Sequence, residues 1–402
     1  MPLSFTEQLL SQMDNHLRGV ELCLVVDSLM ERMPQWGEEA RDLLRSWLLL
    51  MKENEASDID FGAPGSNGKI WMRVYGNKYI LPTLGEYSDV EMTAIITSWL
   101  SPMQKQKLFD NFVLDFSAFA TQDGKENRYR GTCYLDRGYL CTNFRRINDF
   151  IFSMQQLRIP KPIMERMNLQ SEKSGLILIT GITGSGKSTT LDAVIDMNNR
   201  DNKGHIVIIG NPIEYVHESK SCLVRHREVG VDVLSFAHGA IESLRQDPDI
   251  IIVGEMRDPN TISTVLEITD SGHKAFTTLH TSSAIDSIHR IVAEFPSDEQ
   301  ERIRNRLADV LSVIVSQKLV PSVDNKRVMT REILSVDASV QAAIRNKNIG
   351  EIYQMMVEGK RYGMCTLEQD LHELYKKGII THLTAMSYAN NKKRMYQLIS
   401  MT

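Results

Sequence analysis

A glycine-rich loop at residues 181–188 constrains this chain more than any other stretch of its sequence. It reads Gly-Ile-Thr-Gly-Ser-Gly-Lys-Ser, which is the complete GxxxxGK[ST] pattern of a phosphate-binding loop. The apolar residues 175–180 before it predict a buried strand, and residues 189–195 after it predict a helix. Because the motif stands in strand–loop–helix context, we interpret it as a phosphate site rather than a chance glycine-rich turn.

Each residue type in this loop suits the binding of a nucleotide. Glycines let backbone N–H groups face an anion, and the positive end of the following helix adds to the attraction. Lys187 is expected to reach the β- and γ-phosphates of ATP, and the Ser188 hydroxyl is expected to ligate Mg²⁺. The predicted nucleotide-binding residues are Thr183, Gly184, Ser185, Gly186, Lys187, Ser188 and Thr189.

The composition narrows the class of protein. The chain has 402 residues, enough for two or three domains, and its formal net charge of −5 argues against a general affinity for nucleic acid. Its five cysteines have no CxxC spacing, so we expect no disulfide framework, no structural zinc site and a reducing cytoplasm. No signal peptide is visible, and the apolar run 47–51 is too short to span a bilayer. We therefore expect any membrane link to run through a partner.

The first third of the chain predicts a helical extension and a small domain. Residues 1–42 have apolar side chains at helical spacing, with a break at Pro34 and Gly37 and a second helix from Glu38 to about Asn54. This extension is either a docking appendage or a set of helices packed on the next domain. Residues 43–147 predict an α+β domain with an antiparallel sheet, whose strands cover 57–61, 69–75, 111–119, 128–134 and 139–146 and whose helix covers 88–110.

The rest of the chain predicts a second, larger domain. The stiff segment 159–162 lies in a predicted linker over residues 148–174. Residues 175–335 then alternate helices with continuous apolar strands at 205–209, 250–253 and 274–279, which indicates a mainly parallel sheet covered on both faces. Residues 336–402 predict helices, one of them with a capping box at 366–369, an apolar stripe at 367, 371 and 374, and an end at Gly378.

Three kinds of side chain are candidates for chemistry beside the loop. Glu255 follows the strand 250–253 and is the predicted catalytic acid and metal ligand, although a surface ion pair with Arg257 would also explain it. His280 ends the strand 274–279, where it would sense the γ-phosphate or serve as a structural histidine. His273 faces the other way, and Asp249 is interpreted as a turn residue. Among the arginines of the smaller domain, Arg130, Arg137 and Arg145 are candidate fingers for a neighbouring subunit's nucleotide.

Several stretches of the sequence together resemble a known family. They are residues 184–191, 211–220, 245–258 and 278–281, with 343–346 similar to the start of a C-terminal helical signature. They resemble the type IV pilus retraction motors of the type II/IV secretion ATPase superfamily, over about residues 43–395. The resemblance implies a PAS-like N-terminal domain, a RecA-like ATPase domain, a homohexameric ring and a nucleotide between the two domains. It also implies MgATP as substrate, a cytoplasmic location and an inner-membrane platform protein as partner.

The chain departs from the family pattern at three places. Residues 1–42 have no counterpart in the usual short retraction motor, and the helical signature diverges after Asn346. The acidic box before Pro212 usually reads Glu-Asp, whereas here it reads Gly210-Asn211. A glutamate at 210 would help to orient the attacking water, so we predict normal MgATP binding but slow hydrolysis by the chain alone. The alternative is that another carboxylate serves; Glu214 is not an obvious substitute, because its family position already holds a glutamate.

Several functions are consistent with the sequence. The leading hypothesis is a hexameric motor ATPase that drives pilus retraction. The closest alternative is the ATPase of a type IVB secretion or conjugation system, in which extra N-terminal sequence is common. A third is a weakly hydrolysing regulatory ring subunit that acts beside a paralogous ATPase. A nucleic-acid translocase is disfavoured by the net charge and by the lack of a basic stripe.

Overall fold

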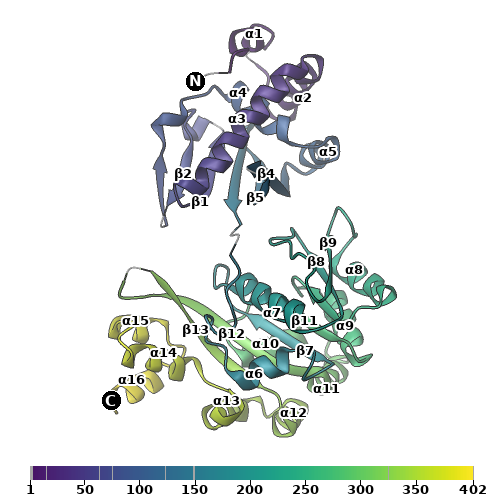
Figure 1. The fold of residues 1–402 in the computed structure, drawn as a ribbon, viewed down its shortest axis with the longest axis vertical. Coiled ribbons are helices and arrows are strands. Elements are labelled where there is room, and N and C mark those ends of the chain that lie inside the picture. Colours follow the sequence, from purple (N-terminus) through teal and green to yellow (C-terminus); the bar gives the residue numbers. More distant parts are fainter. Residues whose placement is uncertain are drawn as a thin grey trace. The chain divides into compact units, whose positions relative to one another are not determined.

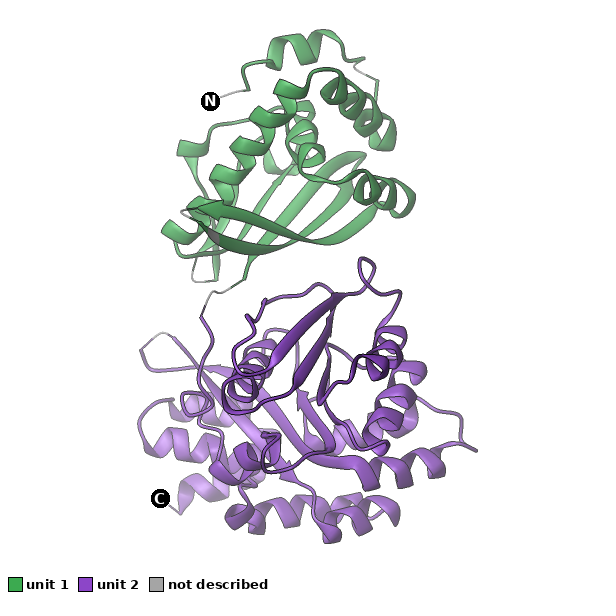
Figure 2. Cartoon of the chain, turned by 45° about the vertical axis from the view of Figure 1, so that its right-hand side comes forward, with its two compact units in different colours: residues 1–149 green, residues 150–402 purple. Residues whose placement is uncertain are grey.

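The structure is a computed structural model that describes residues 3–14, 16–62, 64–74, 76–122, 124–147, 150–324 and 326–401. The chain divides into two compact units, residues 1–149 and residues 150–402 (Figure 2). Each unit has its own sheet and its own apolar core. In the described residues, no helix is both long enough and apolar enough to cross a bilayer.

Unit 1 is an antiparallel sheet with helices against it, which confirms the predicted α+β class (Figure 1). The strand order is β3-β2-β1-β6-β5-β4. The predicted helix 88–110 is two helices, because Ser101 caps a new one that begins at Pro102. The elements are α1 (Thr6–Ser11), α2 (Gly19–Arg32), α3 (Pro34–Glu53), β1 (Ala56–Gly62), η1 (Pro64–Ser66), β2 (Trp71–Val74), β3 (Asn77–Ile80), η2 (Pro82–Leu84), α4 (Asp89–Trp99), α5 (Pro102–Asn111), β4 (Val113–Gln122), β5 (Lys125–Asp136) and β6 (Tyr139–Arg146).

The N-terminal helices belong to the core of unit 1. Leu22 and Val26 of α2 are buried in the same apolar cluster as Trp47 of α3 and Phe144 of β6. The packed interpretation of the extension is therefore the one that the structure supports. The predicted break at Pro34 is confirmed, because α2 ends at Arg32 and α3 begins at Pro34, but Gly37 does not interrupt α3, so the predicted start at Glu38 is four residues late. Proline lacks an N–H, which the first turn of a helix does not need, so it starts this helix instead of interrupting it.

Unit 2 is built on a seven-stranded sheet in the order β13-β12-β7-β11-β10-β8-β9. All neighbours are parallel except the pair β12–β13, so the predicted mainly parallel sheet is confirmed. The strands β9, β12 and β13 were not predicted. The strands are β7 (Gly175–Thr180), β8 (His205–Gly210), β9 (Leu223–Glu228), β10 (Ile250–Val253), β11 (Lys274–Leu279), β12 (Leu311–Pro321) and β13 (Arg327–Ser335).

Helices cover both faces of this sheet. Leu176 and Leu178 of β7 face one core, which they share with helices α8–α13, while Ile177 and Ile179 face a second core with α6 and α7. The helices are α6 (Lys161–Met167), α7 (Lys187–Asp201), α8 (Phe236–Ser243), η3 (Leu244–Gln246), α9 (Pro259–Asp270), α10 (Ala284–Ala293), α11 (Gln300–Val310), α12 (Ala338–Arg345), α13 (Ile349–Glu358), η4 (Gly359–Tyr362), α14 (Leu367–Lys376), α15 (His382–Tyr388) and α16 (Lys392–Ser400).

The segment predicted as a linker is largely part of unit 2. Leu157, Ile163 and Met167 are buried in the core that faces α7, so residues 150–174 form a packed edge of unit 2 and not a free connection. The prediction was misled by two prolines, which stiffen the chain whether or not it is packed. Residues 148 and 149 of the predicted linker lie outside the described residues.

The C-terminal helices follow their sequence signals. The Thr366 hydroxyl accepts a hydrogen bond from the backbone N–H of Gln369, and the Gln369 side chain accepts one from Thr366, which completes the predicted capping box. Leu367, Leu371 and Leu374 are buried in a separate apolar cluster. Gly378 follows α14 with a φ of +67°, a conformation that favours glycine.

A buried carboxyl group in unit 2 leads to a prediction about stability. Glu332 on β13 is 4% exposed and accepts a hydrogen bond from the Ala284 N–H at the start of α10 (2.7 Å). Burial raises the pKa of Glu332 from 4.5 to about 7. The folded state thus keeps the proton as the unfolded chain loses it, so stability falls as pH rises from about 4.5 to 7. Glu332→Gln removes this dependence.

We expect the free energy of unfolding of Glu332→Gln, relative to that of the wild type, to rise by about 2–3 kcal/mol between pH 5 and pH 8. This figure follows from about 1.4 kcal/mol for each pH unit over which only the unfolded carboxyl group is ionised. Urea unfolding of both proteins at the two pH values measures this difference. Glu301→Gln, at an exposed position of α11, is the control and should show no such gain. Parallel stability curves for Glu332→Gln and wild type would contradict the assigned pKa.

Candidate functional site

The phosphate loop joins the carboxyl end of β7 to the start of α7, as the sequence predicts. Gly181 has a φ of +149°, and a Cβ there would lie 2.4 Å from the Gln317 carbonyl oxygen, so no other residue fits. A Cβ on Gly184 would meet no atom within 4 Å, so this side of the loop is open. Thr183, Gly184 and Ser188 are exposed, Gly186, Lys187 and Thr189 are half-buried, and Ser185 is buried.

Lys187 lies over the loop. Its Nζ donates hydrogen bonds to the carbonyl oxygens of Gly181 (2.8 Å) and Ile182 (3.2 Å). Burial lowers the pKa of Lys187, while the negative charges of Glu255 and Glu214 oppose that shift. The Ser185 hydroxyl is buried and has no hydrogen-bond partner among the described residues. A half-buried ammonium held by neutral carbonyls, an unpartnered hydroxyl and an open glycine-rich backbone together fit a phosphate group.

Gln317 of β12 supports the loop from behind, and the sequence pattern did not reveal it. Its side-chain Nε2 donates to the Ser185 carbonyl oxygen (3.0 Å), and its Oε1 accepts from the Thr190 hydroxyl (2.9 Å). Gln317 is 1% exposed, so these bonds are shielded from water. One side chain therefore ties the loop to the first turn of α7. The only sequence signal was a polar residue within an apolar run.

We expect Gln317→Met to weaken nucleotide binding. Methionine fills a similar volume but leaves the Thr190 hydroxyl and the Ser185 carbonyl without their partner. Each lost partner in a buried site costs about 1–3 kcal/mol, so the Kd for ADP should rise about tenfold. Fluorescent-ADP titration measures this, with Gln170→Met at an exposed position as the control. An unchanged Kd in a less stable protein would show that Gln317 serves stability alone.

Glu255 lies two residues after the end of β10, and its carboxylate has two basic neighbours. Its Oε1 is 3.1 Å from Nε2 of His280, and the same oxygen contacts Nε of Arg257. Glu255 therefore forms the ion pair with Arg257 that was the alternative interpretation, and it also lies where the catalytic acid was predicted. Arg257 is 67% exposed and Glu255 only 19% exposed, so the arginine is free to leave for solvent while the carboxylate stays.

His280 joins this group from the neighbouring strand. It follows β11, and the strand end is fixed to β10 because the Thr278 hydroxyl donates to the Gly254 carbonyl (2.7 Å). Arg290 holds the His280 carbonyl oxygen (2.9 Å). Burial and the nearby charge of Lys187 lower the pKa of His280, with Glu255 acting in the opposite direction. The structure therefore brings Lys187, Glu255 and His280 to one edge of the sheet, as predicted.

The other two polar positions near these strands lie away from that group. His273 precedes β11 and its Nδ1 lies 3.0 Å from the Ser271 hydroxyl, at the amino end of the strand. Asp249 precedes β10 and accepts a hydrogen bond from the His205 N–H (2.8 Å), which is a structural role. Both residues therefore lie at the amino ends of their strands, opposite to the end that carries the phosphate loop.

Gly210 ends β8 beside this edge. The Gly254 N–H donates to the Ile209 carbonyl oxygen (2.8 Å), so residue 210 lies next to the residue before Glu255. A Cβ at Gly210 would meet only the far end of the Ile213 side chain closer than 3 Å. Glu214 is half-buried, and its charge acts on Lys187. Glu214, which the sequence pattern did not favour as a substitute, therefore lies near enough for its charge to act on Lys187.

The three candidate arginines lie in unit 1 on one hairpin. Arg130 of β5 and Arg145 of β6 are direct cross-strand partners, so the structure brings them together. Asp115 lies 3.9 Å from Arg130, and Asp58 lies 2.8 Å from Arg145. Arg137 is exposed in the turn at the other end of the hairpin, with a φ of +55°. A single nucleotide cannot contact all three arginines. The pair Arg130–Arg145 is the better candidate for contacting a phosphate, because its two positive charges lie side by side.

Comparison with known proteins places the chain in a family. A family model described as "Type II/IV secretion system protein" matches residues 143–399. A Neisseria gonorrhoeae relative named "Twitching motility protein" is 36% identical over 81% of this chain and 85% of its own length. A solved structure of the pilus retraction motor PilT with bound ADP is 36% identical, with a TM-score of 0.77 over 87% of this chain and 98% of that one.

A second solved structure extends the likeness. It is the ATPase DotB of Legionella pneumophila, 26% identical, with a TM-score of 0.69 over 96% of this chain and 98% of that one. The matched region of the family model includes the phosphate loop, Glu255 and His280. The chain belongs to the family of type II/IV secretion system proteins.

Proposed function

We propose that this protein is a motor ATPase that couples ATP hydrolysis to type IV pilus retraction, the disassembly step that underlies twitching motility. The observation that carries the proposal is the complete phosphate loop at the same edge of the parallel sheet as the Glu255–His280 pair, in a chain of this family. The names of its relatives support retraction as the movement that the motor drives, since they include a twitching motility protein and a pilus retraction ATPase. The ADP bound to PilT in its solved structure supports a nucleotide as the ligand.

The residues of this chain take separate roles toward MgATP. Lys187 exchanges its bonds to two carbonyl oxygens for the β- and γ-phosphates, and the loop N–H groups hold the remaining oxygens. Ser188 and Glu255 would hold Mg²⁺, which neutralises charge on the phosphates when it is bound. His280 holds Glu255 in place and reports on the γ-phosphate position.

We infer that the working form is a homohexamer in which Arg130 or Arg145 reaches a nucleotide of a neighbouring subunit. Arginines supplied between subunits stabilise transition-state charge by about 10³-fold or more. Turnover per subunit should therefore rise with protein concentration until the ring is complete. Paired light scattering and phosphate-release assays over a dilution series measure this. A fully active monomer would contradict it.

A second candidate function is the ATPase of a type IVB secretion or conjugation system. One observation favours it: the DotB structure covers 96% of this chain, and the part left out is shorter than the 42-residue extension, so that match includes some of the extension. The pilus motor structure covers 87%. The pilus proposal still has more support, because identity is higher to the pilus relatives.

The two candidates differ in their membrane partner. We propose a cytoplasmic protein that works at the inner membrane through a platform protein, beside a paralogous ATPase and without nucleic acid. Affinity purification of the full chain from its host, with a Lys187→Ala bait as the control for nucleotide-dependent contacts, identifies that partner. A pilus platform protein supports the proposal, and a secretion-system platform protein with no pilus component would contradict it.

A further inference from the structure

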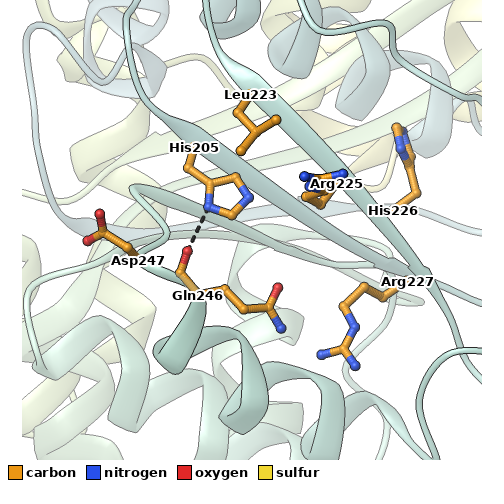
Figure 3. A pocket seen from close by; sticks show the side chains of 7 residues that line it. All are labelled: His205, Leu223, Arg225, His226, Arg227, Gln246 and Asp247. Atoms are coloured by element: carbon orange, nitrogen blue, oxygen red, sulfur yellow. Dashed lines mark hydrogen bonds between the residues drawn. The ribbon is translucent and has the colours of Figure 1, made fainter.

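A basic hollow lies in unit 2 away from the phosphate loop. It has a volume of about 530 Å³ and is lined by His205 of β8, by residues of β9 and by residues at the end of η3 (Figure 3). The lining residues are His205, Leu223, Arg225, His226, Arg227, Gln246 and Asp247. This volume is within the usual range for sites that bind small molecules.

The pleat of β9 concentrates positive charge on one side. Leu223, Arg225 and Arg227 alternate along the strand, so their side chains share one face, and β9 is the edge strand of the sheet. In Figure 3 the two arginines and the Gln246 amide lie around one space with His205, whereas His226 lies on the far side of β9. Residues i and i+2 of a strand lie about 7 Å apart along the backbone, so the two arginine side chains leave neighbouring positions of one face and their positive charges add there.

Two side chains that line this hollow carry a buried polar atom with no hydrogen-bond partner among the described residues. Arg227 uses Nη2 for Glu242 (2.8 Å), but its Nη1 is buried and has no hydrogen-bond partner among the described residues. His205 donates from Nδ1 to the Gln246 carbonyl oxygen (2.9 Å), which leaves a buried Nε2 unpartnered within the same described set. Arg225 is exposed and forms no ion pair in the part of the chain that the structure describes. Buried groups of this kind normally have a partner, so the missing partner points to a ligand.

The chemistry of the lining selects a phosphate ester. Arginine binds phosphate through paired N–H groups, and the one carboxylate in the lining, Asp247, lies on the opposite side of His205 from the arginines (Figure 3). Leu223 adds an apolar wall that an inorganic ion would not need. The site is separate from the phosphate loop, because β9 lies four strands from β7, which is about 19 Å at the usual strand spacing.

We propose that this hollow is a second ligand site, which binds a phosphorylated small molecule of nucleotide size. Arg225 and Arg227 hold the phosphate, while His205 and Gln246 meet polar groups of the attached moiety and Leu223 packs on its apolar face. This site is distinct from the one that hydrolyses ATP, since none of its lining residues belongs to the phosphate loop or contacts it.

Titration of the full chain with AMP, followed by ³¹P NMR, tests this site. The Lys187→Ala background silences the phosphate loop, so the signal reports the hollow alone. We expect saturable binding that weakens at least tenfold in Lys187→Ala/Arg225→Gln. It should persist in Lys187→Ala/Arg302→Gln, which removes the same charge from an exposed position of α11 outside the hollow. Adenosine, which lacks phosphate, should bind at least tenfold more weakly than AMP in a ¹H saturation-transfer experiment.

Three results would overturn the proposal. The first is no saturable AMP binding in the Lys187→Ala background. The second is equal weakening in the Arg225→Gln and Arg302→Gln proteins, which would mean that general charge attracts the ligand. The third is adenosine binding as tightly as AMP, which would mean that phosphate is not recognised. None of these results bears on the proposed ATPase, because the phosphate loop is disabled in every protein of the series.

Discussion

Lys187→Ala should reduce ATP turnover to the background of the assay while the fold stays intact. The lysine is the cation of the phosphate loop, and its Nζ lies within hydrogen-bond distance of two loop carbonyls, where a phosphate oxygen would replace them. Removing it takes away charge stabilisation that develops with the transition state, so a loss of about 10³-fold or more is expected. Because the side chain is only half-buried and packs in no core, the substitution should cost little stability.

Phosphate release under saturating MgATP measures the loss. Lys203→Ala, at an exposed position of the same unit, is the matched control and should retain full turnover. Circular dichroism and thermal unfolding confirm that both variants fold. Unchanged steady-state hydrolysis in Lys187→Ala would remove the phosphate loop from the mechanism.

Gly210→Glu should speed up hydrolysis by the isolated protein. Residue 210 lies beside Gly254, one residue before Glu255, so a carboxylate there can hydrogen-bond a water near the γ-phosphate. Glycine offers no such group, and the Asn211 amide is not a base. General-base assistance is worth about 10²–10⁴-fold, which sets the range of the expected gain. Nucleotide affinity should stay the same, because the loop and Glu255 are unchanged.

The new side chain needs room, which the structure provides in part. A Cβ at residue 210 would lie 2.7 Å from Cδ1 of Ile213, the end of a flexible side chain, and 3.2 Å from the Pro212 carbonyl oxygen. Gly210→Ala is therefore the matched control, since it introduces the same crowding without the carboxylate. A wild type that already turns over at a typical motor rate, and is not accelerated in Gly210→Glu, would contradict the prediction.

Glu214 is the alternative source of a carboxylate. Its charge opposes the lowering of the Lys187 pKa by burial, so Glu214 lies near enough to the loop to influence the phosphates. If Glu214 assists hydrolysis, Glu214→Gln should slow the wild type strongly and slow Gly210→Glu much less. The double variant Glu214→Gln/Gly210→Glu thus shows whether Glu214 supplies the carboxylate in the wild type, because the effects of two residues that act on the same water are not additive.

The sequence predicted the parts of unit 2 whose signals are local. The phosphate loop combines a fixed motif with an apolar strand and a helix, and the strands β8, β10 and β11 are continuous apolar runs. Glu255 and His280 are predictable from the sequence because each follows the carboxyl end of such a strand. These ends meet at one edge of a parallel sheet. Their mutual contact of 3.1 Å follows from that placement.

Features set by distant contacts were not predictable. β9 is rich in charge, and β12 follows α11 without a turn residue, so neither shows a clear strand boundary. Gln317 lies 132 residues after Ser185, and no local pattern links them. Pro34 separates α2 from α3 as the sequence predicts, but α3 begins there and not at Glu38, because Gly37 is buried within the helix, where packing outweighs its low helix propensity.

Direct observation of labelled pili in the host tests the proposed function most directly. We predict that pili extend but fail to retract when this gene is deleted, that the wild-type chain restores retraction, and that Lys187→Ala does not. Retraction at the wild-type rate in the deletion strain, with no other retraction ATPase present, would contradict it.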